Sequence, residues 1–327
     1  MILVTGGAGF IGSNVVAALC DRGDAVAVCD RFGRDDKWNN LRKHAVFDFV
    51  APRDCIDWLQ RHHRDVTAVV HMGAITATTE PNVDRLVVNN IRCSIDLWEY
   101  CTHAGVPFLY ASSAATYGDG SQGFDDDWSE TALSRLRPLN AYAWSKHLFD
   151  RRVSRIVEHG GPTPPQWAGL KFFNVYGPNE YHKGDMRSVV ARNYPRAAEG
   201  RVIRLFKSHR DGIADGDQRR DFVYVRDCVN VVLWLLGEPS VSGIFNVGSG
   251  QARSFLDLVT ALYTAVGREP AVKFVDMPLE LRDKYQYHTV AKLDRLRKAG
   301  YAADSTPLED GVVDYVQRFL AQADRYR

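Results

Sequence analysis

The chain has 327 residues, 45% of them hydrophobic and 25% charged, which is enough for a full core in two domains or one large one. Its 41 Lys and Arg residues against 40 Asp and Glu residues leave a formal charge of +1, so no overall field favours nucleic acid or an anionic membrane as a partner. The longest apolar run, residues 229–236, is less than half of the ~20 residues that span a bilayer, and we expect no membrane partner.

The first predicted strand begins almost at Met1. Residues 2–5 favour a strand, and a strand that starts there leaves no room for a signal peptide. The six cysteines include no CxxC pair and stand mostly among apolar residues, so we interpret them as reduced thiols rather than disulfides or metal ligands. They are Cys20, Cys29, Cys55, Cys93, Cys101 and Cys228. These features predict a cytoplasmic protein without a metal site.

Short apolar runs alternate with longer amphipathic stretches through the first half of the chain. This is the rhythm of βαβ units in a parallel sheet with helices on both faces, and the apolar run at residues 68–70 suits a strand buried on both sides. We therefore expect an α/β fold with a doubly wound parallel sheet. The predicted strands are 2–5, 25–29, 68–71, 108–111 and 168–173, and the predicted helices are 12–22, 88–104 and 144–157.

A glycine-rich loop follows the first predicted strand and opens the first predicted helix. Gly7, Gly9 and Gly12 fit the GxGxxG pattern, and Gly6, Gly9 and Gly12 fit GxxGxxG. Glycines permit a tight turn and a close approach to a pyrophosphate, and the free N–H groups of the following helix favour its negative charge. Because strand, loop, helix and second strand come in this order, the loop predicts a dinucleotide site.

The second predicted strand ends at Asp30, where an acidic side chain accepts hydrogen bonds from the adenosine ribose of NAD. Arg31 follows directly, and Lys37 lies in the same loop. Two cations at this place neutralise a 2′-phosphate that Asp30 alone would repel. We therefore expect NADP as the cofactor, with NAD as the alternative if Arg31 and Lys37 form only a solvated surface.

Two further motifs carry chemistry. Tyr142 and Lys146 form a YxxxK pattern and lie four residues apart on one face of a predicted helix. Since a nearby ammonium favours phenolate, we expect Lys146 to lower the pKa of Tyr142 and also to reach the nicotinamide ribose. Upstream, the strand predicted at 108–111 leads into small hydroxyl residues at the sheet edge where ligands bind, and we expect Ser113 to hydrogen-bond the reacting hydroxyl opposite Tyr142.

After Asn174 the loops become longer and the apolar spacing less regular. We expect residues 1–173 to form the dinucleotide-binding domain and residues 174–327 mainly a smaller α/β substrate-binding domain, with segments at about 218–247 returning to the first domain. The polar, glycine-containing segment 207–217 predicts an exposed loop.

The residues above carry a resemblance to a known family. The chain resembles the extended short-chain dehydrogenase/reductases, a Rossmann-fold family whose members act on nucleotide sugars. The resemblance spans the whole chain and rests on the patterns TGGAGFIGSN, YxxxK and FNVYGP. Its closest pieces, residues 108–118, 173–178 with 182–184, and 220–225, are similar to the branch that inverts carbon 6 of an ADP-bound heptose, a precursor of lipopolysaccharide.

This resemblance implies an NADP-bound homo-oligomer that oxidises the exocyclic carbon 6 to a ketone and returns the hydride to the other face. It makes Tyr142 one acid/base and Lys183 the other, because inverting a stereocentre requires proton transfer on both faces. Without the resemblance, Lys183 would be interpreted as a solvated loop residue. The resemblance also implies further contacts. The cofactor contacts are Phe10, Ile11, Asn89 and Val175, and the substrate contacts are Asn174, Phe206, Tyr285 and Arg220, whose planar fork suits a diphosphate.

The chain departs from the pattern of that branch in the substrate pocket. Where the branch has a Ser and a His that contact the substrate, this sequence has Asp185 and Arg192, which we place among the substrate contacts. The segment 208–216 is also longer than the pattern predicts. These differences bear on the sugar that binds rather than on the chemistry.

Other functions leave different signatures at the same positions. A 4,6-dehydratase would carry Asp and Glu directly after the hydroxyl residue of the strand end, where this chain has Ala114 and Ala115, so dehydration loses its catalysts. A nucleotide-sugar 4-epimerase of the UDP-glucose type shares the YxxxK pattern and is the main alternative. A non-catalytic NADP(H) sensor is a remote alternative, because it would not need Ser113, Tyr142 and Lys146 together.

Overall fold

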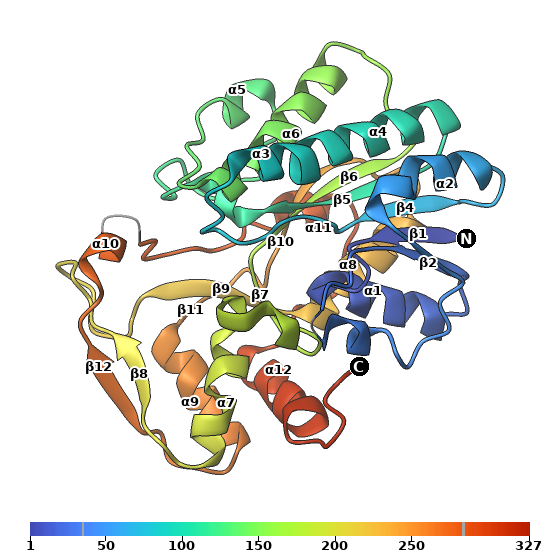
Figure 1. Ribbon diagram of the computed structural model, residues 1–327. Coiled ribbons are helices and arrows are strands. Elements are labelled where there is room, and N and C mark those ends of the chain that lie inside the picture. Colours follow the sequence, from blue (N-terminus) through green and yellow to red (C-terminus); the bar gives the residue numbers. More distant parts are fainter. Residues whose placement is uncertain (35, 283–284) are drawn as a thin grey trace.

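The protein is described here by a computed structural model of residues 1–34, 36–282 and 285–327, built around a seven-stranded sheet (Figure 1). The strand order is β10-β6-β5-β4-β1-β2-β3, and every neighbouring pair is parallel. The strands are β1 (Ile2–Thr5), β2 (Val26–Cys29), β3 (Asp48–Val50), β4 (Ala68–His71), β5 (Phe108–Ser113), β6 (Trp167–Phe172) and β10 (Gly243–Val247). Because the order reverses direction at β1, between β2 and β4, the carboxyl ends of these strands open a crevice where ligands bind in such sheets.

Helices cover both faces of the sheet, so the predicted doubly wound arrangement is confirmed (Figure 1). Successive residues of a strand point to opposite faces. Val4 accordingly packs in the apolar cluster that contains Val16 of α1, and Leu3 packs in the cluster that contains Trp98 of α4. The first face is covered by α1 (Phe10–Asp21), α8 (Val225–Gly237) and α11 (Asp294–Lys298), and the second by α2 (Cys55–Arg61), α4 (Cys93–Ala104) and α6 (Ala141–Glu158).

Several predicted elements agree with the structure to within a few residues. β4 spans the predicted residues 68–71, and β5 runs two residues beyond its predicted end, to Ser113. The helix predicted from residue 144 begins earlier, at Ala141. Its start is fixed by Asn140, whose side chain accepts a hydrogen bond of 2.9 Å from the N–H of Ala143 and so caps the helix.

The helix predicted over 88–104 is present but begins earlier, at Val83, and is not α-helical throughout. The short helix α3 (Val83–Leu86) leads into a π-helical stretch, Val87–Arg92, and α4 begins only at Cys93. The wider turn accommodates Asn90, which is fully buried and bonds both backbone groups of Ile75 and the hydroxyl of Ser145 on α6. Tertiary hydrogen bonds therefore override the helical periodicity here.

The second half of the chain adds two small sheets and a third apolar cluster beside the central sheet (Figure 1). One sheet has the order β11-β9-β7, and the other pairs β12 with β8. The strands are β7 (Asn174–Tyr176), β8 (Ile203–Phe206), β9 (Arg219–Tyr224), β11 (Ala252–Ser254) and β12 (Val272–Val275). The remaining helices are α5 (Glu130–Leu133), α7 (Val189–Ala198), α9 (Phe255–Ala265), α10 (Leu279–Arg282) and α12 (Leu308–Tyr315). The chain between β8 and β9 is largely exposed and forms no helix or strand, as predicted for the loop 207–217.

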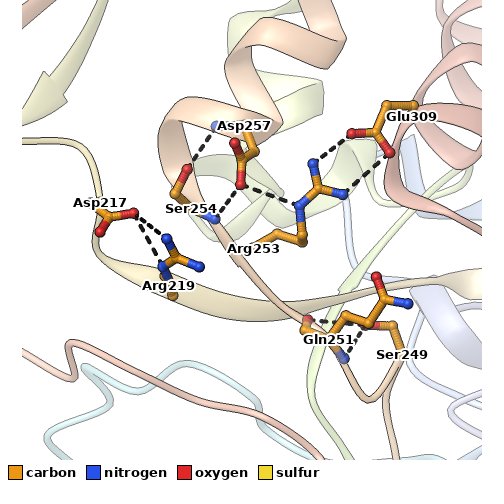
Figure 2. Close-up of polar contacts among 8 residues, drawn as sticks. All are labelled: Asp217, Arg219, Ser249, Gln251, Arg253, Ser254, Asp257 and Glu309. Carbon is orange, nitrogen blue, oxygen red and sulfur yellow. Dashed lines mark hydrogen bonds and ion pairs between the residues drawn. The ribbon is translucent and has the colours of Figure 1, made fainter.

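Figure 2 shows a polar cluster that connects β11 with α9 and α12 and consists of Arg253, Ser254, Asp257 and Glu309. Ser254 and Asp257 form a reciprocal capping box at the start of α9. Arg253 lies between two carboxylates and bonds Asp257 at 3.2 Å and Glu309 of α12 at 2.6 Å. Because Arg253 is also paired with Arg220 across β11 and β9, the cluster fixes the strand that carries Arg220.

All six cysteines are free thiols, and four of them are buried. Among the helices in the described ranges, none combines the length and the apolar character needed to cross a membrane.

Candidate active site

A cavity of about 850 Å³ runs along the carboxyl ends of the central strands. Its volume lies within the ~300–1,000 Å³ that is usual for small-molecule and cofactor sites. The cavity is lined by both predicted groups of residues, those for the dinucleotide and those for the chemistry. The predicted residues that line it are Gly6, Gly9, Phe10, Ile11, Gly12, Asp30, Arg31, Lys37, Asn89, Ser113, Tyr142, Lys146, Asn174, Val175 and Lys183. One continuous space thus joins residues from distant parts of the sequence.

The glycine loop is folded so tightly that side chains would not fit. Gly6 has a φ of +64°, and a Cβ there would lie 2.6 Å from the backbone of Gly73. A Cβ on Gly12 would collide with the carbonyl oxygen of Gly6. Helix α1 begins directly behind this turn, at Phe10, and Gly9 at its N-cap offers no side-chain hydrogen bond to the first N–H groups. A close turn with an uncapped helix start beside a cavity fits the diphosphate of a dinucleotide.

At one end of the cavity Asp30 forms an ion pair with Lys37. Its carboxylate accepts a hydrogen bond of 2.9 Å from the N–H of Ala8 and one of 2.5 Å from the ammonium of Lys37. The side chain of Asp30 is 8% exposed and that of Lys37 17%. Arg31 lies beside them with an exposed side chain. The negative charge of Asp30 is therefore balanced within the protein, and the neighbouring guanidinium is open to solvent and to the cavity.

At the other end, helix α6 brings Tyr142 and Lys146 against the carboxyl end of β5. The hydroxyl of Tyr142 lies near the side chain of Ser113, which favours the phenolate form and so acts to lower the pKa of Tyr142. The ammonium of Lys146, one turn further along, donates a hydrogen bond of 2.8 Å to the carbonyl oxygen of Ala111. Helix α6 and strand β5 therefore bring three predicted catalytic residues to the same cavity, namely Ser113, Tyr142 and Lys146.

The expected lowering of the pKa of Tyr142 by Lys146 is wrong for the protein as it stands. Burial raises the pKa of Tyr142, and the nearby side chain of Ser113 acts in the opposite direction. Burial also lowers the pKa of Lys146 to about 8. The physical reason is that removal from water disfavours both charged forms, and the carboxylate of Asp150 raises the pKa of Tyr142 further.

Lys183 reaches the same cavity from a turn in the second half of the chain, Tyr181–Met186. Its ammonium lies over the ring of Phe10, 5.3 Å from the ring centre. Burial lowers the pKa of Lys183, while the carboxylate of Glu180 raises it. A lysine that is partly buried and has a lowered pKa exchanges a proton more readily near neutral pH than a solvated one.

Five predicted substrate residues do not line this cavity. Asp185 and Arg192 are exposed, and the side chain of Arg192 lies 3.5 Å from the carbonyl oxygen of Asp185. Phe206, Arg220 and Tyr285 form a cluster of their own. The ring of Tyr285 lies 6.4 Å from that of Phe206 and 5.1 Å from the guanidinium of Arg220.

Arg220 is a buried cation with a lowered pKa. Its residue is 8% exposed, and burial is the main cause of the lowering. Over the described ranges, no carboxylate forms an ion pair with Arg220, and its guanidinium donates only to the carbonyl oxygen of Arg219. Gln286, the residue after Tyr285, lines the main cavity. A guanidinium with spare donors beside a cavity is suited to bind an anionic group.

Sequence reasoning missed polar residues that shape this site. His71 at the end of β4 lines the cavity and bonds Thr5 at 2.6 Å and Ser94 at 2.9 Å. Its position at the carboxyl end of a predicted strand was the available signal. No local pattern in the sequence points to Asn40, because its hydrogen-bond partners lie 32 or more residues away. Within the described part of the chain, no three His, Cys, Asp or Glu side chains are grouped to hold a metal ion.

Known proteins resemble this chain over its whole length. The model of the NAD dependent epimerase/dehydratase family matches residues 2–248. The ADP-L-glycero-D-manno-heptose-6-epimerase of Nitratidesulfovibrio vulgaris strain Hildenborough is 50% identical over 99% of each chain. The solved structure of the Helicobacter pylori ADP-L-glycero-D-manno-heptose-6-epimerase is 27% identical, with a TM-score of 0.78 over 97% of this chain and 95% of that one. Thermus thermophilus UDP-glucose 4-epimerase, solved with NAD, is also 27% identical, with a TM-score of 0.73 over 96% and 97%.

Proposed function

This chain belongs to the NAD dependent epimerase/dehydratase family, and on that premise we propose that it is an ADP-L-glycero-D-manno-heptose 6-epimerase. The enzyme inverts carbon 6 of ADP-D-glycero-D-manno-heptose and so makes the L-epimer, a precursor of lipopolysaccharide. The observation that carries this proposal is the 50% identity over 99% of both chains to an enzyme of that name. The site agrees with it, because two groups able to transfer protons, Tyr142 and Lys183, line the same cavity from different elements.

A nicotinamide dinucleotide, when bound, supplies a hydride acceptor and donor. The residues that would hold it are those of the glycine loop for the diphosphate and Asp30, Arg31 and Lys37 for the adenosine ribose. Asn89, Lys146 and Val175 would lie along its other half. The fit rests on the tight glycine turn, which leaves no room for side chains, and on a cavity that continues from this turn to Tyr142.

The chain's own residues then handle the protons of the substrate. Ser113, which lies near Tyr142, would hold the carbon 6 hydroxyl at the phenol. One of the pair Tyr142 and Lys183 takes the hydroxyl proton as the ketone forms. The other returns a proton to the oxygen when carbon 6 has been reduced from the opposite face. Two groups are needed because inversion exchanges the faces of carbon 6.

We infer that NADP is preferred over NAD. Lys37 neutralises Asp30, so the carboxylate does not repel a 2′-phosphate, and the exposed guanidinium of Arg31 stands beside it. Arginine binds phosphate oxygens in pairs through its planar fork. NAD is the alternative, and it is the cofactor named for the Thermus thermophilus relative.

The second half of the chain, residues 174–327, would mainly bind the sugar nucleotide. The buried cation of Arg220, with Tyr285 and Phe206 beside it, would take the diphosphate, and Asn174 the sugar. Asp185 and Arg192 lie outside the cavity, and we propose that they contact the substrate when their segment closes over the sugar.

We further propose that the enzyme is cytoplasmic and forms a homo-oligomer. Light scattering of the purified protein tests the oligomeric state.

The function is tested by incubating the purified protein with ADP-D-glycero-D-manno-heptose and following the epimer ratio by NMR. A second candidate, a nucleotide-sugar 4-epimerase, is favoured by the likeness to the Thermus thermophilus enzyme. UDP-glucose in a parallel incubation distinguishes the two. Conversion of the heptose alone supports the proposal, and conversion of UDP-glucose alone supports the second candidate.

A further inference from the structure

A buried ion pair lies directly behind the predicted catalytic groups. The ammonium of Lys171 on β6 is 2.7 Å from the carboxylate of Asp150 on α6, and their side chains are 1% and 0% exposed. Neither residue lines the cavity. A buried ion pair is often no more stabilising than an apolar pair of the same size, because both charges lose their hydration. The stability of the fold alone therefore does not account for the presence of this ion pair.

The carboxylate of Asp150 gathers hydroxyl groups from the end of β5. Ser112 donates a hydrogen bond of 2.7 Å to it, and Tyr110 one of 3.2 Å. Since the side chains of successive strand residues point to opposite faces, the side chain of Ser113 points away from Asp150, and both serines line the cavity. Asp150 thus holds the strand at the residue before Ser113.

Lys171 holds the same strand end through Thr116. Its ammonium donates a hydrogen bond of 2.7 Å to the hydroxyl of Thr116. That hydroxyl in turn donates one of 2.8 Å to the carbonyl oxygen of Ser113. The remaining face of the ammonium lies 5.0 Å from the ring centre of Tyr117. The ion pair therefore reaches the backbone of Ser113 through a single intervening side chain.

Helix α6 meets β5 at three successive turns. Tyr142, Lys146 and Asp150 are spaced four residues apart and so lie on one face of the helix. Tyr142 lies near Ser113, Lys146 donates to the carbonyl oxygen of Ala111, and Asp150 accepts hydrogen bonds from Ser112 and Tyr110. The first two contacts belong to the predicted catalytic set. The contact of Asp150 is the most deeply buried of the three, and it fixes the position along β5 at which α6 places Tyr142 and Lys146.

We propose that Asp150 and Lys171 are positioning residues for the epimerisation, which hold Ser113 beside Tyr142 at the cavity. This inference rests on the proposed function. An apolar pair would fill the same space, but it would offer no acceptor to Ser112 and no donor to Thr116. A fully satisfied polar network of this kind allows one arrangement of helix and strand. A small displacement of reacting groups is enough to lower turnover strongly.

The test uses two double variants, each of which removes both charges of the pair. Asp150→Asn with Lys171→Met keeps the shape and one acceptor for Ser112, and Asp150→Leu with Lys171→Met removes the acceptor as well. We expect kcat to fall about tenfold in the first and further, to about a hundredfold, in the second. The KM for the heptose substrate and the Kd for NADP, measured by fluorescence titration, stay within about threefold, because no contact to either ligand is lost.

Asp227→Leu is the matched control. Asp227 is a buried carboxylate on α8 that accepts two hydrogen bonds of 2.8 Å from Thr306, away from the cavity. Its loss lowers the melting temperature but leaves kcat unchanged.

The inference is overturned if the Asn/Met variant keeps kcat within about twofold of the wild type, or if Asp227→Leu lowers kcat as much. The Asn/Met variant decides the matter where the Leu/Met variant does not fold. A wild-type enzyme that converts no heptose would instead refute the proposed function.

Discussion

The side-chain amide of Asn40 lies 3.2 Å from Nδ1 of His182, the residue before Lys183. The same amide donates hydrogen bonds to the carbonyl oxygens of Ala8 at 2.9 Å and Asn179 at 3.1 Å. Ala8 belongs to the glycine loop, so one buried side chain connects this loop to the turn that carries Lys183. The hydrogen bonds of Asn40 thus couple the position of the glycine loop to the position of the turn that carries Lys183.

Replacing Asn40 by Ala should destabilise the protein by about 1–3 kcal/mol, because buried carbonyl oxygens lose their donor. Urea unfolding measures this change. Asn39→Ala is the control in the same turn, since Asn39 makes one local bond, to the carbonyl oxygen of Asp36. Equal stability of the two variants would show that the link through Asn40 contributes nothing.

Tyr142 and Lys183 should both be needed for turnover. Tyr142→Phe and Lys183→Ala are each expected to lower kcat by about 10²–10⁴-fold, the usual effect of losing an acid/base group. Stopped assays started from each epimer in turn measure the loss. Lys207→Ala serves as a control, because Lys207 pairs with Asp276 on the surface. Full activity of Lys183→Ala would contradict a two-base mechanism and favour a 4-epimerase, in which the sugar turns over between half-reactions.

The guanidinium of Arg31 should discriminate between the two dinucleotides. Arg31→Ala is expected to weaken NADP binding about 10- to 150-fold, since a hydrogen bond to a charged group contributes about 1.5–3 kcal/mol, and to leave NAD binding unchanged. Fluorescence titration with both cofactors provides the comparison. Arg22→Ala, in a surface pair with Asp24, should change neither affinity. A variant of Arg31 that loses NAD and NADP equally would remove the basis for an NADP preference.

Acid should destabilise the protein through His71. Burial lowers the pKa of His71 to about 3, from an ordinary value of 6.5. Between these values the unfolded chain binds a proton that the folded protein does not, so stability falls as the pH drops below about 6.5, by at most about 1.4 kcal/mol per unit from this group. Urea unfolding of the wild type and of His71→Gln at pH 7 and pH 5 measures this loss of stability. The variant should lose less stability than the wild type over this range, and parallel losses would contradict the assignment.

Much of the fold was predictable because its signals are local. The glycine loop, the buried strand at 68–71 and the YxxxK spacing each depend on residues within one turn or strand. The π-helical stretch at Val87–Arg92 was not predicted, since the bonds of Asn90 to Ile75 and Ser145 span 15 and 55 residues. Tertiary hydrogen bonds of this kind leave no trace in periodicity.

The candidate site was predictable in its residues but not in its electrostatics. Tyr142, Lys146 and Ser113 were identified from spacing, and the structure brings them together at one cavity. Their pKa values depend on how deeply each group is buried, which the sequence does not reveal, and burial raises that of Tyr142 where its neighbour Lys146 was expected to lower it. Lys183 required the family resemblance, because Phe10, whose ring lies under its ammonium in the cavity, is 173 positions away in the sequence.

The most direct test of the account is the fate of the hydrogen on carbon 6. ADP-D-glycero-D-manno-heptose labelled with deuterium at that carbon is incubated with the enzyme in ordinary water, and the product is analysed by NMR. If carbon 6 is oxidised and then reduced by the same hydride, the L-epimer forms with the deuterium retained at carbon 6. Loss of the label to water, or no L-epimer while UDP-glucose is converted, would contradict the account.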